Sequence, residues 1–204
     1  MEASKDHQHE EHVYVSGKNR VLQNACIFGA NASGKTNLLR AMDTAIHLVR
    51  QSNNRQVGEP LIAIEPFLFS KTTQDQPSSF EFVFLQNGMK YVYGFSATRE
   101  RIVKEYLYHY RTSRAAVIFE RIYDSEKKKD QYHFTNSETR KELKPLIEKN
   151  TDNKLFLATA TSWNSKWTKD PCLWFNRINI YDSTDYNRLL HEDGPIFEEK
   201  EGVL

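Results

Sequence analysis

The sequence predicts an α/β fold with α+β character, in which one strand, loop and helix unit lies beside an antiparallel sheet. Residues 24–50 pass from a short apolar run through a glycine-rich loop into helical spacing. Residues 62–123 alternate apolar and polar side chains with a period of two, which is typical of strands with one buried face. Helical spacing returns beyond residue 135, so we expect helices to follow the sheet.

The 204 residues are enough for one domain with a real core. We expect a single, apparently incomplete domain over residues 1–204. Its predicted parts are a polar arm (1–19), the strand, loop and helix (20–60), an antiparallel β subdomain (61–135), and a helical segment with a polar tail (136–204).

Composition excludes several classes of protein. Lys plus Arg number 28 and Asp plus Glu 27, a net charge of +1, so no global field attracts nucleic acid or an anionic membrane. No apolar run approaches the ~20 residues that span a bilayer, and we expect no membrane contact. Cys26 and Cys172 lie far apart, with Cys26 in an apolar run where a small buried residue is needed. This favours a reducing compartment, and we expect a cytoplasmic protein.

The strongest chemical signal is GANASGKT, from Gly29 to Thr36, which fits the phosphate-binding loop (P-loop) pattern GxxxxGK[ST] at every fixed position. The run Asn24–Phe28 before it predicts a buried strand. A helix is expected to start near Gly34. Its apolar face comprises Leu38, Leu39, Met42, Ile46 and Val49.

This pattern predicts a site for ATP and Mg²⁺. Gly29 and Gly34 permit backbone angles and close approaches that a side chain would hinder, and the amides from about Asn31 to Thr36 would face the α- and β-phosphates. Lys35 would reach the β- and γ-oxygens, and the Thr36 hydroxyl would be a Mg²⁺ ligand. The candidate nucleotide-binding residues are Gly29, Ala30, Asn31, Ala32, Ser33, Gly34, Lys35, Thr36 and Asn37.

The stretch IFGANASGKTNLLRAM, from Ile27 to Met42, resembles the P-loop of AAA-type ATP-binding proteins, relatives of ABC-class and SMC-class ATPases in bacterial phage-defence and abortive-infection systems. Asn31 and Asn37 are the more specific parts of the match. Weaker similarity continues through residues 64–69, 78–95, 105–110 and 153–164. The resemblance implies an ABC-like N-terminal lobe that binds ATP.

Two motifs of ABC-type hydrolysis are missing: the Walker B carboxylates and an LSGG-type signature loop. The nearest imitation of Walker B is Ile178–Asp182, but Asn179 interrupts the apolar run and Ser183 stands where the catalytic Glu belongs. Glu65 and Asp182 have no motif context, so the catalytic residue is unknown. The resemblance therefore implies an N-terminal portion of an ATPase that needs a homodimer or a partner polypeptide to supply these motifs.

Alternative functions stay open at this point. The chain is alternatively a non-catalytic nucleotide-binding or interaction module, or a nucleic-acid-associated P-loop protein. A GTPase is disfavoured because Leu155 and Phe156 follow Asn153 and Lys154, leaving the NKxD pattern without its Asp. A small kinase is disfavoured because the long antiparallel block is unlike that architecture.

Within the β region, Asn87 and Gly88 predict a type I′ hairpin turn. Tyr106, Tyr108 and Tyr110 form a stripe that suits either sheet packing or base stacking, and sheet packing is favoured because only scattered cations accompany it. Further alternating positions of the predicted strands are Phe67, Phe69, Phe80, Phe82, Phe84, Tyr91, Tyr93, Phe95, Val117, Phe119, Arg121 and Tyr123.

Outside that region the signals are local. Residues 125–130 predict a solvated loop, Thr135 and Glu138 fit a capping box, and Pro145 should interrupt the helix that follows. Residues 153–162 predict another helix. His7, His9 and His12 lie on a polar arm, where solvated side chains are favoured over metal ligands because no ordered scaffold lies nearby. Val13 to Val15 predict a short edge strand. Trp163, Trp167 and Trp174 lie near Lys166 and Arg177 and suit either an aromatic and basic surface or packing, and packing is favoured.

Overall fold

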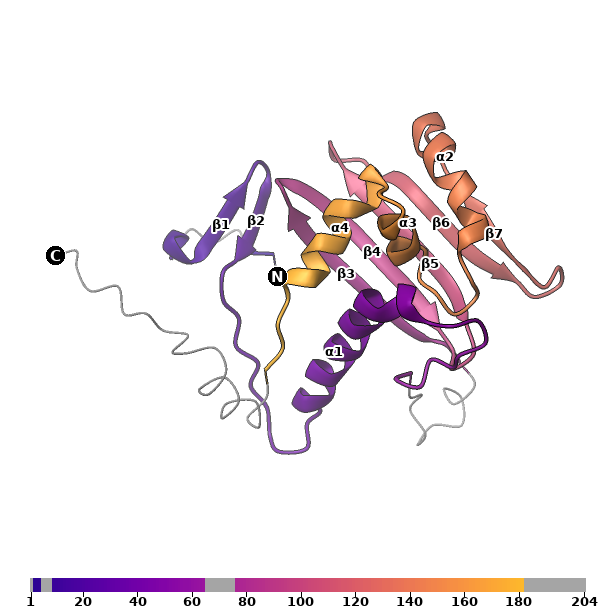
Figure 1. The fold of residues 1–204 in the computed structure, drawn as a ribbon. Helices are drawn as coiled ribbons and strands as arrows, with labels where there is room; N and C mark the ends of the chain where they lie inside the picture. The colour runs from indigo at the N-terminus through magenta and orange to yellow at the C-terminus, as the bar shows by residue number, and fades with distance from the viewer. Residues whose placement is uncertain (1, 5–8, 65–75, 182–204) are drawn as a thin grey trace, which may run out of the picture.

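The computed structural model describes residues 2–4, 9–64 and 76–181. It has an α+β architecture in which helices cover one face of a five-stranded antiparallel sheet (Figure 1). The sheet order is β3-β4-β5-β6-β7. The strands are β3 (Ser78–Gln86), β4 (Met89–Ala97), β5 (Ile102–Tyr110), β6 (Ala116–Asp124) and β7 (Lys129–His133).

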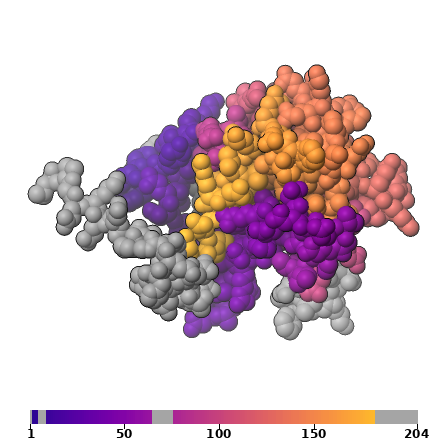
Figure 2. Space-filling view, viewed as in Figure 1, coloured from indigo at the N-terminus to yellow at the C-terminus, as the bar shows by residue number. Residues whose placement is uncertain are grey.

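Helix segments both precede and follow the five-stranded sheet in the chain. They are α1 (Lys35–Gln51), α2 (Ser137–Leu143), α3 (Phe156–Ser162) and α4 (Lys166–Arg177), with 3₁₀ turns η1 (Glu10–His12), η2 (Ser52–Asn54) and η3 (Lys144–Lys149). A separate hairpin, β1 (Val13–Ser16) and β2 (Asn19–Leu22), confirms the predicted short strand near Val13. Figure 2 shows α4 lying against α1, where the two helices form one surface of the molecule.

The antiparallel prediction is confirmed for residues 78–123, because each strand pairs with the next through a short connection. Asn87 and Gly88 have φ of 52° and 73°, the left-handed values that a type I′ turn requires. The predicted loop at residues 125–130 is too long: β7 begins at Lys129, which pairs with Asp124. Predictions for Phe67 and Phe69 lie outside the described residues.

The strand predicted at Asn24–Phe28 is wrong. Within the described residues no strand pairs with this segment, and the side chains of Ile27 and Phe28 are 52% and 90% exposed. Cys26 is likewise exposed rather than buried. An apolar run becomes a strand only when a neighbouring strand satisfies its backbone groups, and the described part of the chain brings none beside it.

The core lies between the sheet and helices α1, α3 and α4. Phe84 of β3 stacks on Trp174 of α4 with ring centroids 4.1 Å apart, and Phe82 and Tyr93 meet Phe175 edge to face. These rings are in adjacent positions because alternate residues of neighbouring strands share a face. Packing is therefore the role of Trp174, as the sequence predicts.

The contacts at the N-terminus of α2 correct the capping prediction. Asn136, not Thr135, caps α2, because its Oδ1 accepts a hydrogen bond from the amide of Glu138. The Thr135 hydroxyl instead donates to the carbonyl of Val117 on β6. Pro145 interrupts the helix as predicted: α2 ends at Leu143, and the chain continues into the 3₁₀ turn η3.

A buried ionic network joins the sheet to α3. Arg121 and Glu105 are both fully buried, with Nη1 and Oε2 3.8 Å apart, and Arg121 also donates to Asp130 at 2.6 Å. Glu105 accepts hydrogen bonds from the amides of Phe156 (2.6 Å) and Leu157 (2.9 Å) at the start of α3. Burial raises the pKa of Glu105, while Arg121 and those two amides oppose the rise.

Arg121 also ties down the segment before α3. Its guanidinium donates to the carbonyls of Lys154 (2.6 Å), Thr151 (3.1 Å) and Asp152 (3.3 Å). The five donors of one arginine therefore bind a carboxylate and several backbone groups at once. This network holds the connection between η3 and α3 on the sheet.

Gly94 of β4 yields a first prediction, because the Tyr106 side chain crosses it. A Cβ built at Gly94 would lie 2.3 Å from the Tyr106 hydroxyl oxygen, which donates to Glu81 of β3 at 2.6 Å. We expect Gly94→Ala to displace the ring and lower the free energy of unfolding by about 1–3 kcal/mol. Urea unfolding followed by tryptophan fluorescence measures this change.

Two variants make this test specific. Ser96→Ala, two residues along the same strand, should cost less than about 0.5 kcal/mol, as a substitution away from the crossing. In a Tyr106→Ala background the added methyl group meets no ring, so the cost of Gly94→Ala should largely disappear. An unchanged cost in that background would contradict the proposed clash.

Candidate functional site

The glycine-rich loop connects the β1–β2 hairpin to α1 and lies at the N-terminal end of that helix (Figure 1). Ala32 and Gly34 both have positive φ, of 62° and 93°, and the amide of Ser33 closes a turn onto the carbonyl of Ala30 at 3.2 Å. Successive residues on the two sides of φ = 0 turn neighbouring amides toward one side of a loop, which makes a concave anion site. The sequence GANASGKT therefore folds locally as an anion-binding loop does.

Lys35 folds back over this loop. Its Nζ donates to the carbonyls of Gly29 at 2.7 Å and Ala30 at 2.8 Å, and lies 3.4 Å from the Ser33 hydroxyl. All three donors of the ammonium group are directed at the loop, so one of these hydrogen bonds must give way when the ammonium group donates to an anion. The positive charge is thus fixed at the rim of the loop rather than extended into solvent.

Glycine is required at positions 29 and 34 of the loop for two different structural reasons. A Cβ on Gly29 would lie 2.6 Å from the Ser33 hydroxyl oxygen, so a side chain there would disturb the turn. Gly34 has φ of 93°, an angle that L residues rarely adopt, and nothing lies within 4 Å of where its Cβ would be. The open space beside Gly34 is where a bound group could approach the backbone.

Helix α1 begins at Lys35, directly after Gly34, as the sequence predicts. Thr36 and Asn37 lie in its first turn, where backbone amides have no acceptor within the helix and the helix dipole is positive. No acidic residue lies in this first turn, so nothing there opposes an anion. These features fit a phosphate, and the Thr36 hydroxyl is a hard oxygen donor of the kind that Mg²⁺ accepts.

The other end of α1 is firmly anchored. Ile46, Leu48 and Val49 are buried against the core. Arg50 donates two hydrogen bonds to the carbonyl of Phe175, at 2.7 and 3.1 Å, and another to the carbonyl of Ile178. The loop is therefore positioned by a helix whose C-terminal half is fixed to α4.

The N-terminal half of α1 is different. Leu38 and Leu39, which the sequence placed on the apolar face with Ile46 and Val49, are 45% and 46% exposed. Together with Ile27 and Phe28 they leave apolar side chains around the loop. The predicted face of α1 is thus buried only in its second half.

Other residues named from the sequence do not join this loop. Glu65, Asp182 and Ser183 lie outside the described residues. Asn153, examined as part of a guanine-binding motif, is buried and donates to the carbonyls of Gln56 and Glu59, which is a structural role. Tyr106 and Tyr108 stack on each other and donate to Glu81 and Glu120, so sheet packing is the role that the contacts of this stripe support.

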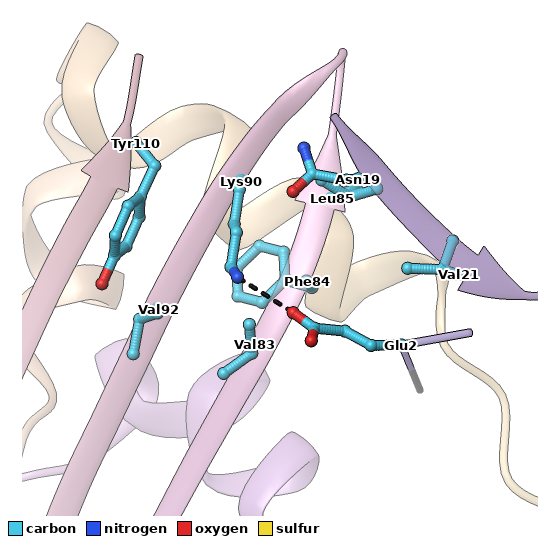
Figure 3. Close-up of a pocket in the computed structure, with 9 residues that line it drawn as sticks. All are labelled: Glu2, Asn19, Val21, Val83, Phe84, Leu85, Lys90, Val92 and Tyr110. Carbon is cyan, nitrogen blue, oxygen red and sulfur yellow. Dashed lines mark hydrogen bonds and ion pairs between the residues drawn. The ribbon is translucent and has the colours of Figure 1, made fainter. Parts of the chain in front are cut away.

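A cavity of about 410 Å³ lies elsewhere, between the β1–β2 hairpin and strands β3 and β4 (Figure 3). Val83 and Val92 form part of its wall, and Lys90 pairs with Glu2 across it at 3.2 Å. No sequence pattern indicates this cavity, because its walls come from segments far apart in the chain. None of the candidate nucleotide-binding residues lines it.

A glycine-rich loop at a helix N-terminus, with its lysine on the loop and a Thr in the first turn, is the arrangement typical of P-loop domains. A family model described as "AAA domain, putative AbiEii toxin, Type IV TA system" matches residues 25–200. The chain therefore belongs to this family of P-loop ATPases. Neither the comparison with curated proteins nor that with solved structures gives a match. Among the described residues, no helix combines the length and apolar character needed to cross a membrane.

Proposed function

We propose that the chain binds Mg·ATP through the loop from Gly29 to Thr36. The observation that carries this proposal is the fixed position of Lys35, whose ammonium group bonds to the carbonyls of Gly29 and Ala30 at the rim of the loop. There it provides a point charge for the β- and γ-phosphates, while the amides up to Thr36 hold the α- and β-phosphates. The Thr36 hydroxyl is the protein ligand of the metal, which neutralises phosphate charge.

We further propose that the chain is part of an ABC- or SMC-like ATPase that serves in bacterial defence. The family description, which names a toxin of a toxin–antitoxin system, supports this role. The residues around the loop supply only one side of such a site. Hydrolysis needs a positioned water and charge on the far side of the γ-phosphate, and the sequence carries no signature loop or Walker B motif for them.

A homodimer or a partner polypeptide is the proposed source of the missing side. Phe28, Leu38 and Leu39 are exposed beside the loop, at 90%, 45% and 46%. Such apolar surface next to a charged site suits a protein contact better than solvent. A non-catalytic nucleotide-binding module that responds by assembly uses the same surface, and turnover separates the two functions.

The purified chain should bind ATP but release phosphate at a rate near background. Calorimetric titration with Mg·ATP measures binding, and steady-state phosphate release measures turnover. Adding a polypeptide that carries Walker B and signature motifs should raise turnover if the complete assembly is an ATPase. Phosphate release by the chain alone, abolished by Lys35→Ala, would show that the site is already complete and would overturn the proposal of a missing side.

A further inference from the structure

Three side chains with metal-binding atoms converge on the surface at the start of the β1–β2 hairpin. His9, Glu11 and His12 each place one ligand atom within 4.8 Å of the ligand atoms of the other two. His9 Nδ1 is 3.0 Å from Glu11 Oε1, and His12 Nε2 is 3.6 Å from the same oxygen. The sequence singles out His7, His9 and His12. His7 lies outside the described residues, and only the fold adds Glu11 to the other two.

Local backbone structure brings these atoms together. His9 adopts a left-handed φ of 61°, and the 3₁₀ turn η1 then carries Glu11 and His12. The amide of His12 donates to the carbonyl of His9 at 3.0 Å. A 3₁₀ helix has three residues per turn, so His9 and His12 lie on the same side of it, and the Glu11 carboxylate reaches both.

The turn is attached to the hairpin at several points. The amide of Gln23 donates to the carbonyl of His12 at 3.0 Å, and its side chain donates to the carbonyl of Glu11 at 3.3 Å. Glu10 pairs with Arg20 of β2 at 2.8 Å, which leaves Glu11 facing the histidines. The arrangement therefore rests on β2 as well as on the turn itself.

The donor set determines the class of ion. Bond lengths of ~2.0–2.2 Å to Zn²⁺ in tetrahedral geometry place ligand atoms roughly 3.3–3.5 Å apart. The two short separations bracket this spacing, so small side-chain rotations would admit an ion. Two imidazoles and a carboxylate suit Zn²⁺ and neighbouring transition metals, whereas Mg²⁺ prefers oxygen ligands only.

We propose that His9, Glu11 and His12 form a surface site for a divalent transition metal ion, with Zn²⁺ as the representative ion and water at the remaining position. This site is separate from the P-loop and does not depend on the proposed function. It offers three protein ligands, the number typical of zinc sites that keep an open position. Its exposure, with all three residues open to solvent, lets the ion enter and leave freely.

The test is a calorimetric titration of the metal-free full chain with ZnCl₂. Wild type should bind one Zn²⁺ at this site, and His9→Ala and His12→Ala should each weaken binding at least about tenfold, as loss of a direct ligand costs no less than loss of its supporting contacts. Glu11→Gln, which keeps the shape of the side chain, should weaken binding as well. Millimolar Mg²⁺ should not compete.

Matched variants separate this site from the rest of the molecule. His47→Ala removes an exposed histidine from α1 and should leave Zn²⁺ affinity unchanged. Lys35→Ala should also leave it unchanged, so failure of nucleotide binding and failure of metal binding are distinguishable. Equal Zn²⁺ affinity in wild type, His9→Ala and His12→Ala would overturn the proposal, as would a loss in His47→Ala as large as in His12→Ala.

Discussion

Arg121→Met should lower the free energy of unfolding by about 3–5 kcal/mol, the cost typical of breaking a buried ion pair from one side. The substitution leaves the buried Glu105 carboxylate without its cation, whereas Asp130 keeps its ion pair with Arg101 at 2.8 Å. It also removes the donors that bind the carbonyls of Thr151 and Lys154. Urea unfolding monitored by the fluorescence of Trp167 and Trp174 measures the loss.

Two further variants show whether the loss comes from burial. Lys127→Ala breaks an exposed ion pair with Asp124 on the same β6–β7 hairpin, where Lys127 is 61% exposed, and should cost less than about 1 kcal/mol. Adding Glu105→Gln to Arg121→Met removes the buried carboxylate charge that has lost its cation, so the double variant should be more stable than the two separate losses predict. Strict additivity, or similar costs for Arg121→Met and Lys127→Ala, would contradict the network.

The antiparallel sheet was predictable because its signals are local. Alternation of apolar and polar residues reports a half-buried strand, and Asn87-Gly88 reports the turn that joins two of them. The helix after the P-loop was predictable for the same reason. β7 was missed because Lys127, Lys128 and Lys129 resemble a solvated loop, although Lys129 already pairs with Asp124.

The Asn24–Phe28 segment shows that a local sequence pattern does not determine whether a segment is buried. An apolar run of that length fits a buried strand, but burial depends on which segments lie beside it. Phe28 is 90% exposed in the structure, and this exposure cannot be predicted from residues 24–28 alone. The same limit applies to Leu38 and Leu39, whose helical spacing was predicted correctly and whose partners were not.

The polar contacts between distant parts of the chain could not be predicted from the sequence, for another reason. Glu105 and Arg121 occupy ordinary alternating positions in β5 and β6, and their charges favoured exposure. They are buried because each meets several partners, including the amides of Phe156 and Leu157, which are more than 50 residues beyond Glu105 in the chain. The loop conformation, by contrast, follows from local signals, since Gly29 and Gly34 act through backbone geometry within six positions and α1 begins directly after them.

Lys35→Ala should weaken binding of Mg·ATP at least about tenfold, which corresponds to about 1.4 kcal/mol or more. The variant removes the point charge proposed for the β- and γ-phosphates. It also removes the bonds from Nζ to the carbonyls of Gly29 and Ala30, so the loop loses part of its support. Calorimetric titration of both proteins with Mg·ATP measures the difference.

Lys18→Ala is the matched control, because it removes one exposed lysine from the β1–β2 turn and should leave ATP affinity unchanged. Thr36→Val then separates the contribution of the metal ion to ATP affinity from that of the phosphate contacts. It keeps the shape of the side chain but removes the proposed Mg²⁺ ligand, so ATP affinity should lose its dependence on Mg²⁺ while binding without the metal is retained. Equal Mg·ATP affinity in wild type and Lys35→Ala would show that the loop is not the nucleotide site.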